Sequence, residues 1–278
     1  LGKGQFKGFV EIVNFESPEI EMQLESNFDL NFIADFFELE QFQNAVGEVS
    51  MKLNFHDIID LDQPEKALQQ LNQAYFAEFN VKDLSFDAEE LPVSLDNLNV
   101  NLVMNGKEAR LNTFEAKMGN SDLKITGFIS DLPAVVHHTN TSVETHLDIE
   151  SKTLDLRELT NFTVIDSSKS GIDEQINNLS LGFTFKSSAK DFTESEYLPK
   201  GEFFIDSLYA EFKNYPHKLN DFYADILIDE KDLKIVDFKG KIDASDFHLD
   251  GFVHDYSFCM QPELNGDVDL DISLKSSN

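Results

Sequence analysis

The stretch that decides the fold is Leu91–Leu132, which reads LPVSLDNLNVNLVMNGKEARLNTFEAKMGNSDLKITGFISDL. A second version, YPHKLNDFYADILIDEKDLKIVDFKGKIDASDFHLDGFVHDY, begins at Tyr215 and aligns without a gap, at an offset of 124 residues. Two unrelated β segments that share only alternation would not keep proline, glycine and Ser-Asp in register, so we predict an internal repeat. The identical pairs include Pro92/Pro216, Leu95/Leu219, Lys107/Lys231, Phe114/Phe238, Lys117/Lys241, Ser121/Ser245, Asp122/Asp246, Gly127/Gly251, Phe128/Phe252 and Asp131/Asp255.

The repeat extends beyond this window, because Gly-Phe-Val or Gly-Phe-Ile also begins at Gly8. We expect repeat units over about 1–125 and 126–250, with a third unit truncated at 251–278. No Pro- or Gly-rich linker divides the chain, so we predict one elongated repeat domain over 1–278. Because the chain begins and ends inside a unit, we expect it to be part of a longer repeating protein.

Apolar and polar residues alternate along most of each unit. Leu98, Val100 and Leu102 alternate with Asn99 and Asn101, which places the apolar side chains on one face of a strand. We therefore predict a mainly β fold: an elongated, curved antiparallel sheet that forms a groove, with one wet face and one apolar face. Further alternating runs are 20–24, 47–55, 79–86, 111–118, 123–129, 143–149, 179–185, 203–210, 222–228, 233–242, 247–253 and 268–274.

A few short helices interrupt the strands. Pro64 precedes a stripe of apolar residues over 65–75, and Pro is favoured at the first turn of a helix. The segments 29–37 and 155–162 each begin with an Asp-Leu pair, in which Asp is a favoured N-cap. The stretch 164–176 is the most loop-like part of the chain.

Composition excludes several classes of protein. Acidic residues outnumber basic ones 52 to 22, and the net charge of −30 disfavours binding to nucleic acid. No stretch approaches the ~20 apolar residues of a membrane-spanning helix, and the single Cys259 excludes an intrachain disulfide framework. The chain has 26 Phe but 6 Tyr and no Trp, which indicates apolar surface without the polar handles common in enzyme pockets.

No catalytic motif is present in the sequence: G-x-S-x-G, H-E-x-x-H and Walker patterns are all absent. Gly2–Gly8 is near a dinucleotide fingerprint but has the wrong final spacing. Asp166–Gly171 begins like a calcium loop, yet Asn177 stands where a glutamate is needed. We predict no enzyme activity, no cofactor and no metal site, although three histidines offer nitrogen atoms: His137, His138 and His146.

The segment 91–132, with its GNSDLKITGFISDL ending, resembles the C-terminal region of AsmA-like proteins of Gram-negative envelopes. The copy at 215–256 resembles it again, and ESKTLDLREL at 150–159 is similar to the segment that follows it. The Phe-rich, acidic composition is similar to that of Bacteroidetes-type members. The resemblance covers essentially the whole chain, although 33–75 and 160–200 match in pattern only.

This resemblance implies a periplasmic protein of the bridge-like lipid-transfer superfamily, anchored to the inner membrane through a segment outside this sequence. It implies phospholipid transport to the outer membrane, with phospholipid or another acyl lipid as partner and envelope proteins as further possible partners. The alternative is a secreted or envelope β-repeat binding or structural module that carries no lipid. The expected lipid-groove residues are Leu98, Val100, Leu102, Met104, Phe114, Met118, Leu123, Ile125, Phe222, Ile226, Ile228, Phe238, Ile242, Phe247 and Leu249.

Overall fold

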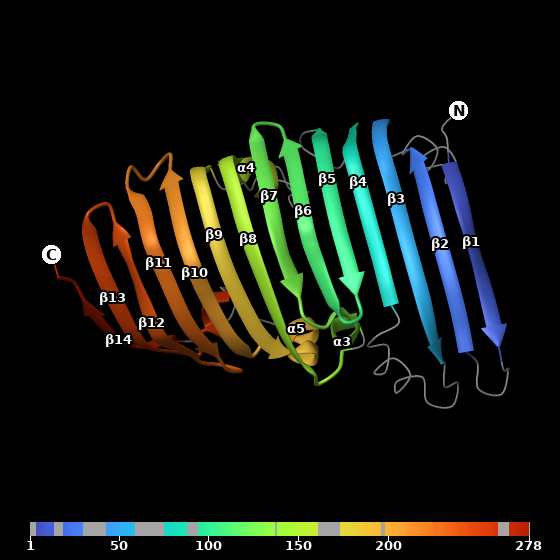
Figure 1. The fold of residues 1–278 in the computed structure, drawn as a ribbon. Coiled ribbons are helices and arrows are strands. Elements are labelled where there is room, and N and C mark those ends of the chain that lie inside the picture. The colour runs from blue at the N-terminus through green and yellow to red at the C-terminus, as the bar shows by residue number, and fades with distance from the viewer. Residues whose placement is uncertain are drawn as a thin grey trace. The chain divides into compact units, whose positions relative to one another are not determined.

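The computed structural model is mainly β, with 75% of its described part in strands (Figure 1). That fraction is about three times the 20–25% of ordinary globular domains. Among the described residues the remaining regular structure is a few short helices. The structure describes residues 4–13, 19–29, 43–58, 75–87, 94–136, 138–160, 173–195, 198–260 and 267–277.

The strands follow one another in antiparallel order. They are β1 (Gly4–Val13), β2 (Glu19–Asp29), β3 (Gln43–Ile58), β4 (Tyr75–Asp87), β5 (Leu95–Asn105), β6 (Glu108–Met118), β7 (Ser121–Ile129), β8 (Ser142–Asp155), β9 (Gln175–Ser188), β10 (Gly201–Phe212), β11 (Lys218–Ile228), β12 (Leu233–Ile242), β13 (Ser245–His254) and β14 (Asp269–Lys275). The described helices are α3 (Leu132–Val136), α4 (Leu156–Thr160), α5 (Ala189–Glu194) and α6 (Ser257–Met260).

Hydrogen-bonded neighbours in the sheet follow chain order from β1 to β14, and the sheet is open. The predicted fold class, one antiparallel sheet with a few short helices, is therefore confirmed. By internal contacts the chain forms two compact units. Unit 1 is 1–128 with 151–175, and unit 2 is 129–150 with 176–278. The single domain over 1–278 and the repeat bounds stay predictions.

The hydrogen-bond register repeats in the two units. Every residue pair between β11 and β12 of unit 2 has its counterpart between β5 and β6 of unit 1, 124 residues earlier. Both register shifts also recur. The first lies between Asp96 and Asn99 on β5 and between Asn220 and Tyr223 on β11, and the second follows Asn101 and Asp225. The β-bulges therefore belong to the repeat. Matching pairs include Leu95↔Met118 and Leu219↔Ile242, Val100↔Phe114 and Ala224↔Phe238, Leu102↔Leu111 and Ile226↔Ile235.

A steric constraint explains why the Gly-Phe-Val motif begins with glycine. At Gly251, where φ is +150°, an added Cβ would lie 2.0 Å from the carbonyl oxygen of Asp271 on β14. At Gly8 it would lie 2.4 Å from the carbonyl oxygen of Gln23 on β2. Both glycines therefore allow the next strand to approach more closely than any side chain would permit.

The helix predictions have mixed outcomes. The predicted helix over 155–162 corresponds to α4, and the Asp155 carboxylate accepts a hydrogen bond from the Arg157 backbone N–H at 3.1 Å, as an N-cap does. The predicted helices over 29–37 and 65–75 lie almost entirely outside the described residues, as does most of the loop predicted over 164–176.

Alternation also missed several elements. It did not predict β1, in which two glycines and two charged residues weaken the pattern, nor α3, α5 and α6. Within unit 2, α3 and α5 lie side by side and enclose a small core made of Ala134, Val143 and Ala189 (Figure 1). Ser188 caps α5 by accepting a hydrogen bond from the Asp191 N–H.

Candidate functional site: the apolar face of the sheet

Cross-strand pairing in unit 1 gathers apolar side chains into rows that run across the strands. Residues directly opposite one another in an antiparallel pair lie on the same face of the sheet. We call the face formed by these rows the apolar face of unit 1. One row consists of Phe28, Val49, Val81, Val100 and Phe114, and the next contains Met51, Phe79, Leu102 and Leu111.

Unit 2 has an apolar face of the same kind. One of its rows consists of Phe185, Phe203, Ile226, Ile235, Gly251 and Ile272, on six consecutive strands from β9 to β14. The next consists of Phe183, Ile205, Ala224, Phe238, Leu249 and Leu274. These rows contain no charged residue.

The opposite, hydrophilic face of unit 1 carries charged and amide side chains. Lys7, Glu25, Lys52 and Glu78 are paired in sequence across β1 to β4, so that opposite charges are neighbours. Asn101 is paired with Asn80 and Thr113, and its amide group donates a hydrogen bond to the side-chain oxygen of Asn80. Asn101 thus lies away from the apolar face, as alternation predicts.

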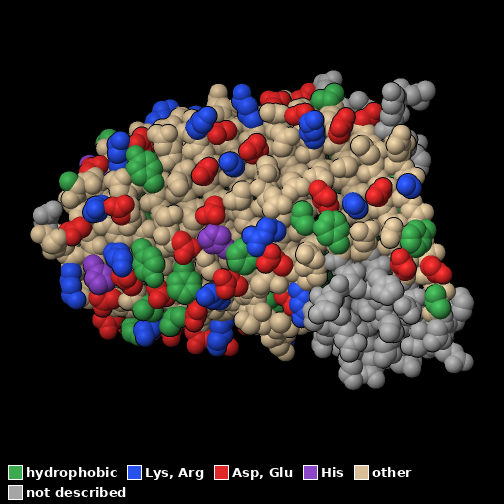
Figure 2. Space-filling model, in the orientation of Figure 1, with side chains coloured by type: hydrophobic (Ala, Val, Ile, Leu, Met, Phe, Trp, Pro, Cys, Tyr) green, Lys and Arg blue, Asp and Glu red, His purple; other side chains and the backbone are tan. Residues whose placement is uncertain are grey.

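Figure 2 shows acidic and basic side chains interspersed over the strands, with scattered hydrophobic ones between them. In unit 2 the same pattern follows from the pairing of Lys186 with Glu202, and of His254 with Asp269. A mixed, solvated surface of this kind needs no ligand to cover it.

The apolar faces are only partly covered. In unit 1, Val49, Val81 and Leu84 form a small buried cluster. In unit 2, Phe185, Ile228 and Tyr256 form another, in which the Tyr256 hydroxyl donates to the Leu198 carbonyl oxygen at 3.4 Å. Among the described residues no large side chain is fully buried. The sheet therefore lacks the closed core of a two-layer sandwich in the part of the chain that the structure describes.

Exposed apolar side chains remain in the rows. Phe79 is 37% exposed in unit 1, and Leu274 is 66% exposed in unit 2. Large apolar groups left accessible in a continuous row are what an apolar ligand requires.

One part of the apolar face in unit 2 is closed by aromatic packing. The rings of Phe222, Phe238 and Phe247 contact one another edge to face, with centroids 5.2–5.9 Å apart. The Phe222 ring lies over Gly240, and Phe222 is 8% exposed. These three predicted groove residues are therefore also a packed cluster.

The structure brings the predicted groove residues together on the apolar faces. In unit 1 the paired neighbours of Leu98, Val100, Leu102, Met104, Phe114 and Met118 are all apolar, and Leu123 and Ile125 alternate along β7. In unit 2 the paired neighbours of Ile226, Ile228, Phe238, Phe247 and Leu249 are apolar residues or glycine, whereas Ile242 is paired with Leu219 on one side and with Ser245 on the other. Contact of these residues with lipid stays a prediction.

The Ser-Asp pair of the repeat has a defined structural role, which the sequence did not reveal. The Asp122 carboxylate accepts hydrogen bonds from the backbone N–H groups of Lys152 and Thr153, at 3.0 and 2.9 Å. Its counterpart Asp246 accepts one from the Ser277 N–H at 2.9 Å. Asp122 therefore connects the start of β7 to β8, and Asp246 connects the start of β13 to the residues that follow β14.

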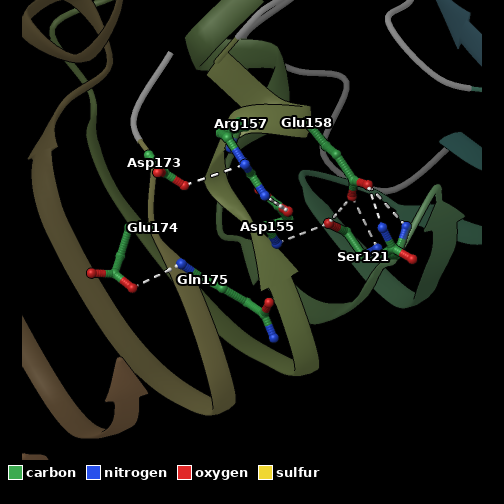
Figure 3. A network of polar contacts seen from close by, with 8 residues as sticks. Ser121, Asp155, Arg157, Glu158, Asp173, Glu174 and Gln175 are labelled. Carbon is green, nitrogen blue, oxygen red and sulfur yellow. Dashed lines mark hydrogen bonds and ion pairs between the residues drawn. The ribbon is translucent and has the colours of Figure 1, made fainter. Parts of the chain in front are cut away.

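In unit 1 a glutamate completes this connection (Figure 3). The Glu158 carboxylate accepts hydrogen bonds from the backbone N–H groups of Asn120 and Ser121, at 3.0 and 3.1 Å, and from the Ser121 hydroxyl. The Ser121 oxygen in turn accepts from the Asp155 N–H at 3.0 Å. No local signal could have identified Glu158, because its partners lie 37 and 38 residues earlier.

Arg157, on α4, forms ion pairs with Asp155 before it and with Asp173 after it in the sequence (Figure 3). Its guanidinium lies 3.0 Å from an Asp155 oxygen and 3.3 Å from an Asp173 oxygen. Hydrogen bonding to Asp155, with the charges of both aspartates, raises the pKa of Arg157. We interpret these contacts of Ser121, Asp155, Arg157 and Glu158 as structural, because Ser121 and Asp155 are buried.

No metal site is found in the part of the chain that the structure describes. His138 Nδ1 contacts the Thr193 hydroxyl at 2.7 Å, and His146 Nδ1 contacts the Thr184 hydroxyl at 2.9 Å. His137 and the stretch 166–171 lie outside the described residues. A search of the described helices for one long and apolar enough to cross a membrane finds none.

No protein-family model, curated protein or solved structure matches this chain in sequence or fold comparisons.

Proposed function

We propose that the apolar faces bind the acyl chains of phospholipid, and that the protein serves phospholipid transport between the inner and outer membranes of a Gram-negative envelope. The observation that carries this proposal is the continuous apolar row, such as the one through Phe203, Ile226 and Ile235, in an open sheet. The resemblance of 91–132 to AsmA-like proteins supports the periplasmic location and an inner-membrane anchor outside this sequence.

Acyl chains suit such a row for energetic reasons. Each buried CH₂ contributes about 0.8 kcal/mol, so a sixteen-carbon tail gains on the order of 12 kcal/mol by leaving water. Apolar side chains provide this gain without hydrogen bonds, whereas a sugar or a nucleotide needs polar partners. The rows contain no charged residue, which fits a hydrocarbon ligand and no catalytic role.

A second candidate is a β-repeat structural or binding module without lipid. The edge-to-face cluster of Phe222, Phe238 and Phe247 favours it, because these side chains fill one another's space in place of a ligand. The two candidates differ in whether the remaining rows bind hydrocarbon.

Lipid extraction followed by mass spectrometry of the purified chain tests the proposal. We expect co-purified phospholipid at a reproducible molar ratio. A β protein of similar size, prepared from the same cells, provides the background. Lipid at no more than this background level, together with no uptake of a fluorescent phospholipid from vesicles, would contradict lipid binding.

A further inference from the structure

Strand β1 forms a free edge of the sheet and exposes large apolar side chains. Among the described strands it is paired with β2 alone (Figure 1). All ten of its residues are exposed, and Phe6 and Val10 are each exposed to 61%. Such an edge offers unpaired backbone N–H and C=O groups, together with apolar side chains, to a further strand.

This edge is long and regular. β1 contains no proline, and its pairing with β2 runs from Gly4↔Phe28 to Val13↔Glu19 without a register shift. Proteins often block an edge with proline, a bulge or a very short strand. Because β1 has none of these, a further strand can pair along most of its length.

Two charged side chains of β1 restrict which strand fits. Lys7 is paired with Glu25 on β2, whereas Glu11 is paired with another acid, Glu21. Like charges directly opposite each other are destabilising. Neither Lys7 nor Glu11 belongs to an ion pair with any residue that the structure describes. The best partner strand therefore places a cation beside Glu11 and an anion beside Lys7.

The sequence of β1 itself meets this requirement. When two β1 strands pair antiparallel with their Phe9 residues opposite each other, Lys7 of each copy lies opposite Glu11 of the other. In the same register Phe6 lies opposite Ile12, and Gly8 opposite Val10. Residues opposite one another share a face, so the apolar faces of the two copies continue into each other.

Other registers fit less well. A slip by one residue sets the apolar face of one copy beside the hydrophilic face of the other. Pairs centred on Lys7 or on Glu11 place like charges opposite each other, and pairs centred on Gly8 or Val10 leave both charges without a partner. On β14, the other edge strand, Lys275 is the last residue. No antiparallel pairing of β1 with β14 can therefore give opposite charges to both Lys7 and Glu11.

We propose that β1 is the interface of a two-fold symmetric dimer, in which the β1 strands of two copies of this chain pair antiparallel about Phe9. Apolar burial and backbone hydrogen bonds provide the affinity, whereas the exposed Lys7–Glu11 pairs add little and select the register. A two-fold interface uses the same surface on both copies, so the assembly closes at the dimer. The proposal does not depend on lipid binding.

Sedimentation of the purified whole chain over a wide range of concentration tests the dimer. We expect a reversible equilibrium between monomer and dimer. Monomer at every concentration would overturn the proposal and leave the edge to a different strand. Assemblies that grow beyond the dimer would also overturn it, because they require two different surfaces.

The variant Glu11→Lys separates an interface from a local role. Within its own copy the new lysine faces Glu21 and improves that pair. In the dimer it faces Lys7 of the second copy, so we expect the dissociation constant to rise by about tenfold or more. Adding Lys7→Glu restores opposite charges across the interface and should recover part of the affinity. An unchanged dissociation constant in Glu11→Lys would contradict the interface.

Two further variants compare the edges of the sheet. Val10→Lys on β1 and Leu274→Lys on β14 are matched, because their wild-type side chains are 61% and 66% exposed. We expect Val10→Lys to abolish the dimer and Leu274→Lys to leave it intact. The reverse result would move the interface to β14 and overturn the proposal.

Cysteine cross-linking tests the register. In a Cys259→Ser background, Phe9→Cys places the two new thiols opposite each other, whereas Gln5→Cys places each thiol opposite Val13 of the second copy. We expect mild oxidation to give a covalent dimer with Phe9→Cys and not with Gln5→Cys. Equal cross-linking of both variants, or of Gln5→Cys alone, would refute pairing about Phe9.

Discussion

A Cβ atom at Gly240 would lie 2.6 Å from Cδ2 of the Phe222 ring, which packs over this glycine. Gly240 on β12 is paired with Phe247 on β13, so an aromatic ring fills the space beside a residue that has no side chain. We therefore expect Gly240→Ala to destabilise the protein by about 1–3 kcal/mol through overpacking. Denaturant unfolding measures this loss.

The double variant separates overpacking from a general effect of alanine. Phe222→Leu shortens the side chain that blocks the new methyl group, so Gly240→Ala should cost less in that background. Equal losses in both backgrounds would mean that the Phe222 ring is not the obstacle.

Removing Glu158 should loosen the turn between β6 and β7. The carboxylate accepts hydrogen bonds from two backbone N–H groups, at Asn120 and Ser121, and hydrogen bonds to a charged group are worth about 1.5–3 kcal/mol each. We expect Glu158→Ala to lower the free energy of unfolding by about 1–3 kcal/mol. Hydrogen exchange should accelerate at the Asn120 and Ser121 amides, while Glu230→Ala, at an exposed turn, should leave them unchanged.

A charge on the apolar face should expel lipid. We expect Ile226→Asp, and likewise Leu102→Asp, to reduce bound phospholipid while the sheet survives, because its hydrogen bonds are made by the backbone. Leu227→Asp is the matched control, since Leu227 is the next residue and is paired with Glu202 and Lys234 on the hydrophilic face. Lipid content and thermal midpoint are measured together.

The outcome distinguishes lipid binding from a packed core. Unfolding of Ile226→Asp with intact Leu227→Asp would favour the lipid-free structural module. A folded Ile226→Asp with undiminished lipid would place the lipid elsewhere.

Asp246 should contribute stability that disappears in acid. Hydrogen bonds from the Ser277 side chain, and next from its backbone N–H, lower the pKa of this carboxyl below its ordinary value of 3.8. A group whose folded-state pKa is lowered stabilises the fold above its unfolded pKa, and this contribution is lost as pH falls through the folded pKa. The thermal midpoint of Asp246→Asn should therefore lie below that of the wild type at neutral pH and approach it below pH 3.8.

Asp267→Asn removes one negative charge from an exposed site and serves as the control for that variant. A midpoint difference between Asp246→Asn and wild type that persists unchanged at the lowest pH would contradict the assignment to Asp246 ionisation.

The repeat was the most informative feature of the sequence. Its gap-free alignment predicted that Leu102 and Ile226 hold the same place, and the matching pairs Leu102↔Leu111 and Ile226↔Ile235 confirm this within each unit. Alternation predicted which residues share a face, because successive side chains of a strand point to opposite sides.

The sequence by itself determined the antiparallel order of β2 to β14, the two faces and the repeat, because each depends on local period or on similarity along the chain. Only the tertiary structure decided that Glu158 joins the turn at Ser121 and that Phe222 covers Gly240. These contacts depend on strand register, bulges and the paths of distant segments. The residues next to a given residue in the sequence therefore do not reveal which distant atoms contact it in the fold.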